Sequence, residues 1–127
     1  MMKKMLLFVL AGLLMMTFSS KADASLVPDG NGCYYWNGDR NYLAVVGAPN
    51  YARFIKLDTC AYGSIDGLNG VRATLATADP DGCSILFNDV VYVMSNGMMK
   101  HGMGGDWEKI NMGNVRSAVR VIYNAAR

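Results

Sequence analysis

The chain has 127 residues, of which 12 are basic and 10 are acidic, and 52% are hydrophobic. This near balance of charge excludes a strongly basic protein that binds nucleic acid or an acidic membrane through its overall field. The hydrophobic content is that of a folded domain rather than of a disordered chain.

The first 24 residues have the layout of a secretory signal peptide. Lys3 and Lys4 precede the uncharged run MLLFVLAGLLMM, and a polar stretch then ends in Ala22-Asp23-Ala24, with small residues at the −3 and −1 positions. The run is shorter than the roughly 20 apolar residues that a membrane span needs. We therefore expect cleavage after Ala24, export to the periplasm or the medium, a bacterial source, and no membrane span afterwards.

The remaining residues, 25–127, are enough for a single globular domain. Lys3, Lys4, Lys21 and Asp23 leave with the signal, so nine basic and nine acidic residues remain. This neutral domain is expected to have no nucleic-acid partner.

Short strands are expected through most of the domain. After an irregular lead-in over 25–32, Asn37-Gly38 separates strands at 33–36 and 42–47, which is a hairpin signal because both residues tolerate positive φ. Residues 53–59 alternate between two faces, with Ile55 on one of them, as in a half-buried strand. The glycine-rich segment 61–70 is interpreted as a loop, and 71–77 as a further strand.

The second half of the domain is expected to hold two strands and a helix. Asp79-Pro80-Asp81-Gly82 predicts a turn. Apolar runs at 83–87 and 90–95 flank Asn88-Asp89, which predicts a tight hairpin at the centre of the sheet. From Asn114 onward, apolar residues recur at helical spacing behind a capping asparagine. The sequence therefore predicts an α+β fold, with a small antiparallel sheet or partly closed barrel of five to six strands and one C-terminal amphipathic helix.

Three cysteines in an exported chain predict one disulfide and one free thiol. In an up-and-down sheet, Cys33 and Cys83 begin the first and fifth strands and lie at the same end. Cys60 follows the third strand and lies at the other end. We therefore expect a Cys33–Cys83 disulfide and a free Cys60, either buried or reactive.

One stretch carries ligands for a soft metal. Met98, Met99, His101 and Met103 lie among glycines and are followed by Trp107. Thioether and imidazole groups suit Cu(I) or Ag(I). In residue types alone, the stretch resembles the sites of small periplasmic copper and silver chaperones, which are β-barrels. Equally, methionine often fills irregular gaps in a core.

Catalysis is not expected. The nucleophile and base with the best spacing are a cysteine and His101, with Asp106 as a third member, but known cysteine-hydrolase patterns are absent. No glycine-rich phosphate loop precedes a helix.

Aromatic residues crowd the first hairpin, and alternation turns some of them away from the core. Tyr34, Trp36 and Tyr42 are therefore candidate contacts for an unidentified protein or glycan partner. The sequence thus favours a small exported binding or accessory protein without a cofactor. The alternative is a periplasmic Cu(I) or Ag(I) carrier that uses residues 98–103.

Overall fold

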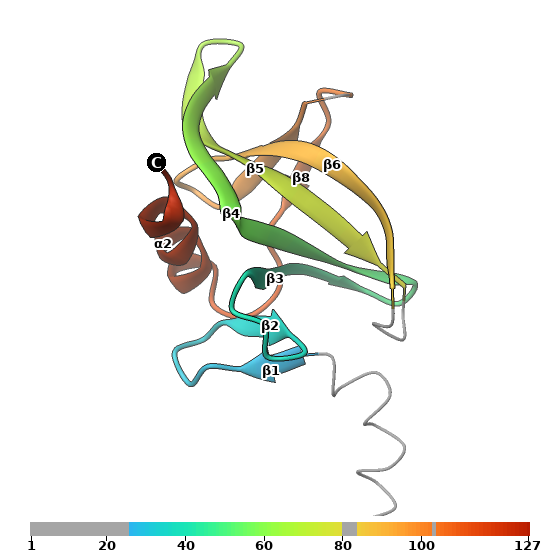
Figure 1. The fold of residues 1–127 in the computed structure, drawn as a ribbon. Coiled ribbons are helices and arrows are strands. Elements are labelled where there is room, and N and C mark those ends of the chain that lie inside the picture. Colours follow the sequence, from blue (N-terminus) through green and yellow to red (C-terminus); the bar gives the residue numbers. More distant parts are fainter. Residues whose placement is uncertain (1–25, 80–83, 103) are drawn as a thin grey trace, which may run out of the picture.

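A computed structural model of the protein describes residues 26–79, 84–102 and 104–127 (Figure 1). The expected signal peptide lies outside these residues, as does most of the expected turn at 79–82. The elements in chain order are β1 (Leu26–Pro28), β2 (Tyr34–Trp36), β3 (Tyr42–Ala48), β4 (Tyr51–Ile65), β5 (Leu68–Ala78), β6 (Ile85–Val93), β7 (Met98–His101), β8 (Trp107–Lys109) and α2 (Val115–Ala125).

The strands form one open antiparallel sheet in which each strand pairs with its neighbours in the sequence, in the order β1 to β8. The α+β class is therefore confirmed, but the described residues form a sheet of eight strands instead of five to six. The strands at Leu26–Pro28, Met98–His101 and Trp107–Lys109 have only three or four residues each. In such short segments, the alternation of apolar and polar residues that indicates a strand cannot be recognised.

The predicted loop over 61–70 is wrong, because β4 and β5 continue through it as a long hairpin. This arm projects beyond the rest of the sheet in Figure 1. Its turn is formed by Asp66 and Gly67, with φ values of 53° and 80°, which fits the tight hairpin turns that need positive φ. The glycines near it therefore lie within strands: Gly63 pairs with Gly70, and a Cβ at Gly70 would come within 2.6 Å of the carbonyl oxygen of Val93.

The predicted tight hairpin at Asn88-Asp89 is also wrong, because both residues lie inside the continuous strand β6. Nor is this strand the centre of the sheet, which is occupied by β4 and β5. β7 pairs only with Val91–Val93, so the first half of β6 has β5 as its one neighbour. Leu86 and Phe87 in that half are 56% and 52% exposed.

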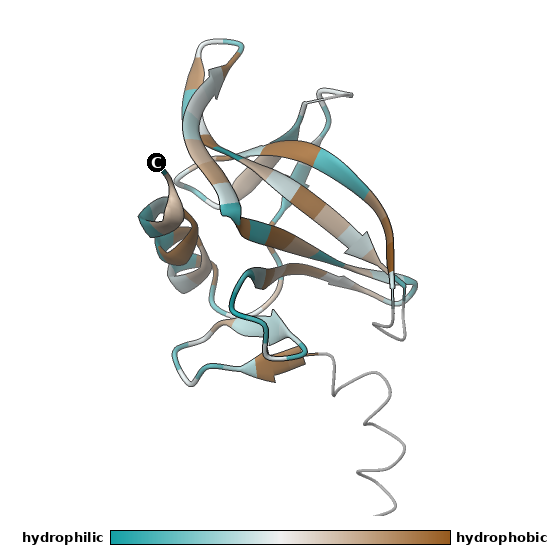
Figure 2. Ribbon diagram, viewed as in Figure 1, coloured by the Kyte–Doolittle hydropathy of each residue, from teal (hydrophilic) through white to brown (hydrophobic). Residues whose placement is uncertain are grey.

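The C-terminal helix is confirmed. Asn114 caps it, since its Oδ1 accepts a hydrogen bond from the backbone N–H of Ser117 at 3.0 Å. Ala118 and Ile122 are buried in the main core, and α2 lies beside β4 (Figure 1). Figure 2 shows hydrophobic and hydrophilic residues following one another along the strands, as expected of strands with one buried face.

The sheet curls strongly, although it does not close. After β8, the backbone N–H of Asn111 donates to the carbonyl of Val45 in β3 at 2.8 Å, and the Asn111 side chain accepts from the N–H of Gly47 at 2.9 Å. These bonds tie the end of β8 to β3. As a result, the last two strands fold back over the inner face of β4, β5 and β6.

Candidate functional site

Charged residues occupy part of the inner face of the curled sheet. Residues directly opposite each other in an antiparallel pair share a face. Arg53 of β4 is opposite Thr77 of β5, and Asp89 of β6 is opposite the fully buried Leu75. The register therefore places these polar groups on the same face as the hydrophobic core.

His101 and Glu108 reach this face from the folded-back strands. His101 of β7 is opposite the buried Val91, and Glu108 of β8 is opposite the buried Met99. The curl then brings His101 and Glu108 toward Arg53 and Asp89, which lie 48 and 12 residues before His101 in the chain.

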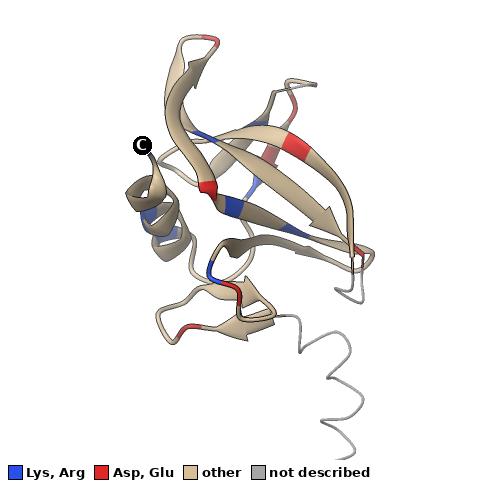
Figure 3. Cartoon of the chain, in the orientation of Figure 1, with Lys and Arg blue, Asp and Glu red and all other residues tan. Residues whose placement is uncertain are grey.

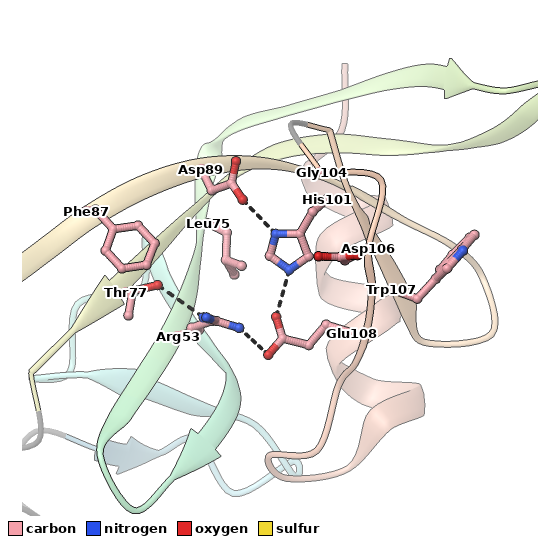
Figure 4. Close-up of a pocket in the computed structure, with 10 residues that line it drawn as sticks. All are labelled: Arg53, Leu75, Thr77, Phe87, Asp89, His101, Gly104, Asp106, Trp107 and Glu108. Carbon is pink, nitrogen blue, oxygen red and sulfur yellow. Dashed lines mark hydrogen bonds and ion pairs between the residues drawn. The ribbon is translucent and has the colours of Figure 1, made fainter.

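These side chains form one connected network (Figure 4). Asp89 Oδ2 lies 2.6 Å from His101 Nδ1, and Glu108 Oε1 lies 2.9 Å from His101 Nε2. The other Glu108 oxygen pairs with the guanidinium of Arg53, whose Nε donates to the Thr77 hydroxyl at 3.2 Å. The four charged side chains are only 14% to 20% exposed.

A cavity of about 360 Å³ lies beside this network, between β4, β5 and β6 on one side and β7 and β8 on the other. Gly104 and Asp106, in the turn between β7 and β8, complete its wall. In Figure 4 the Phe87 ring lies beside Thr77, whereas the Trp107 ring points away from His101. The cavity is therefore polar on most sides, with an aromatic ring at one side.

The two carboxylates hold His101 as a cation. Partial burial alone would lower the pKa of His101, but the hydrogen bonds and negative charges of Asp89 and Glu108 outweigh it and raise the pKa. The geometry gives the same answer. A neutral imidazole has a single N–H and would turn a lone pair toward one carboxylate, whereas an imidazolium donates to both.

Stability is expected to fall as the pH rises through the folded-state pKa of His101. Because that pKa is raised, the stabilisation is fully present below the unfolded value of about 6.5 and is lost above it. Urea unfolding between pH 5.5 and 8.5 tests this. The range is chosen to end below the ordinary cysteine pKa of 9.0. The variant His101→Gln should remove most of this dependence of stability on pH. An unchanged dependence would contradict the assignment of His101 as a cation.

Met98 to His101 of the methionine–histidine stretch form the strand β7 rather than part of a loop. Met99 is fully buried in the main core, and its neighbour Met98 faces the other side of β7, as successive strand residues do. Both nitrogens of His101 contact carboxylates, and Met103 lies outside the described residues. Within the part of the chain that is described, no three His, Cys, Asp or Glu side chains form a metal-binding group. Copper or silver binding stays a prediction.

The aromatic residues of the first hairpin pack mostly against one another. The Trp36 ring stacks on Phe54 at 5.4 Å between centroids and meets Tyr42 edge-on at 5.3 Å. Tyr34 joins them in a second, smaller hydrophobic cluster, and all three candidate contacts are partly buried. Packing accounts for their presence, and their role as partner contacts stays a prediction.

Cys33 and Cys60 are buried, and neither forms a disulfide with another described cysteine. Both lie in the main core cluster. Cys60 lies within β4, so the expectation that it follows the end of a strand is wrong. Cys83 lies outside the described residues, and its disulfide with Cys33 stays a prediction. Burial, helped by Asp58, raises the pKa of Cys60 to about 11, so its thiol is protonated at neutral pH and is a weak nucleophile.

Comparison with protein-family models, curated proteins and solved structures gives no match. Among the described residues, no helix is long and apolar enough to cross a membrane. Charged residues of both signs are distributed over the strands rather than gathered in one region (Figure 3).

Proposed function

We propose that this protein is a small, non-catalytic binding protein whose ligand occupies the cavity beside His101. The observation that carries this proposal is a cavity of about 360 Å³ whose charged wall is held in place by hydrogen bonds within the protein. That volume falls within the usual range for small-ligand sites, about 300–1,000 Å³. A wall that is already ordered costs little conformational entropy when the ligand binds.

The same network argues against catalysis. To act as a general base, His101 would need a free ring nitrogen to accept a proton. Both of its nitrogens are engaged with carboxylates. Among the described residues, those that line the cavity include no cysteine or serine, and the Thr77 hydroxyl already accepts a hydrogen bond from Arg53. A hydroxyl or thiol nucleophile paired with a histidine base is therefore lacking among the described residues of this cavity.

Export of this binding protein remains part of the proposal. It rests on the charged, apolar and small-residue pattern of the first 24 residues. An exported binding protein meets free small molecules, glycans and proteins, all of which can present a polar group to a cavity of this size.

A ¹⁵N–¹H NMR titration of residues 25–127 tests the site. The panel comprises methyl glycosides, small carboxylates and small amines. At least one of these classes should shift the backbone signals of Thr77, His101, Gly104 and Glu108 in a saturable way. Signals of the first hairpin, 34–42, serve as the internal control.

Two results would overturn the proposal. One is a panel in which no class shifts the cavity signals. The other is a set of saturable shifts confined to the first hairpin, which would move the contact surface to Tyr34, Trp36 and Tyr42.

A further inference from the structure

The groups around the cavity carry an excess of negative charge. Arg53 and the His101 cation supply two positive charges, against three negative ones from Asp89, Asp106 and Glu108. Both cations are already hydrogen-bonded to carboxylates of the network. Asp106 is exposed at the cavity wall and has no basic partner among the described residues.

Hydrogen-bonding capacity points in the same direction. Both N–H groups of His101 are used by the network, and the Arg53 guanidinium donates to Glu108 and Thr77 while it lies over the Tyr51 ring at 4.5 Å. Each carboxylate oxygen can accept more than one hydrogen bond. The remaining capacity of the cavity is therefore mainly that of an acceptor, and it suits a ligand that donates.

An apolar wall lies close to these acceptors. Leu75 lies on the inner face of β5 and lines the cavity, and the half-exposed Phe87 ring lies beside Thr77 (Figure 4). A short alkyl chain can cover the aromatic ring, and a cation near the ring gains from its quadrupole.

We infer that the group bound in this cavity is a primary ammonium on a short alkyl chain, with Asp106 as its counter-ion and Phe87 as the cover of its chain. Such a group is carried by free alkylamines and by lysine side chains. The inference rests on the proposed function, because it names the ligand chemistry of the same cavity.

The probe is n-butylammonium chloride, compared with 1-butanol and sodium butyrate in NMR titrations of residues 25–127. We expect saturable shifts at the cavity with a dissociation constant of roughly millimolar order for the ammonium, as for a small fragment. Binding of the alcohol and of the carboxylate should be at least about tenfold weaker, since they lack the positive charge.

Two matched variants test the counter-ion. Asp106→Asn keeps the shape but removes the charge, and should weaken n-butylammonium binding about fivefold. Asp58→Asn removes an exposed acid of β4 that does not line the cavity, and should leave binding unchanged. Equal effects of the two substitutions would overturn the role of Asp106.

Nα-acetyl-lysine methylamide separates the two sources of the ammonium. Binding at least about fivefold tighter than that of n-butylammonium assigns the cavity to a lysine residue of a polypeptide, and equal binding assigns it to a free amine. Preferred binding of butyrate or of a neutral glycoside would overturn the ammonium inference and leave the proposed function standing. Absence of any ligand at the cavity would overturn both.

Discussion

Glu108→Ala should destabilise the fold by about 3 kcal/mol, because it removes the carboxylate that Arg53 and His101 share. Both cations are less than one-fifth exposed, so water cannot fully replace the lost partner. Breaking a buried pair leaves an uncompensated charge, here that of Arg53, while His101 loses one of its two carboxylates. Urea unfolding of residues 25–127 at pH 6, followed by circular dichroism, measures the change.

Asp66→Asn is the control, because it also removes a carboxylate that pairs with a base, while asparagine tolerates the positive φ of this turn position. Asp66 lies 3.2 Å from Lys100 but is itself 68% exposed. An exposed pair of this kind contributes no more than about 1 kcal/mol. Equal losses of stability in the two variants would show that the Glu108 network is no more important than a surface ion pair.

The variant Glu108→Gln separates charge from shape. Its amide can still accept a hydrogen bond, but it brings no negative charge to His101. The pKa of His101 should therefore fall relative to the wild type, and the loss of stability between pH 5.5 and 8.5 should be smaller and end at a lower pH. An NMR titration of the His101 ring follows this directly.

The parts of the fold that could be predicted are those set by local sequence. Asn37-Gly38 has positive φ at both residues, 53° and 76°, and joins β2 to β3 as expected. The capping side chain of Asn114 is likewise a local device, and the helix begins directly after it. Such signals depend on neighbours within a few residues, which the sequence displays.

Asn88-Asp89 shows why the same local reasoning fails elsewhere. These residue types favour turns, yet the Asp89 side chain accepts from the backbone N–H of Val90 and pairs with His101, 12 residues later. A contact made across the sheet therefore overrides the local preference. At Asp66-Gly67 the error is different. This pair is a true hairpin signal, but the neighbouring glycines led to the whole segment being interpreted as a loop.

The candidate site was only partly visible in the sequence. His101 stood out because it is the only histidine, but as a metal ligand rather than as a partner of carboxylates. Arg53 carried a usable signal, since in the alternating run 53–59 it shares the face of Ile55, where a charge needs a partner. Glu108 carried no usable signal in the sequence, because its contact with Arg53 spans 55 residues and depends on the curl of the sheet.

The start of the helix depends on a close approach of two backbone segments. Gly113 has φ of +69°, and a Cβ at this position would overlap the carbonyl oxygen of Gly32. That carbonyl accepts the N–H of Asn114 at 2.6 Å, which holds the helix start against the segment between β1 and β2. Gly113→Ala should therefore destabilise the fold by about 3 kcal/mol, from the left-handed backbone and the steric overlap together.

Gly30→Ala isolates the first of these causes, the left-handed backbone. Gly30 also has positive φ, +85°, but a Cβ there would meet no atom within 4 Å. Its substitution should cost about 1 kcal/mol, from the backbone conformation alone. The difference between the two variants in urea unfolding is therefore the steric cost of placing a Cβ at residue 113 against the Gly32 carbonyl. If the two alanine variants lose equal stability, the helix start can move away from Gly32 without cost, and this contact does not fix the position of α2 on the sheet.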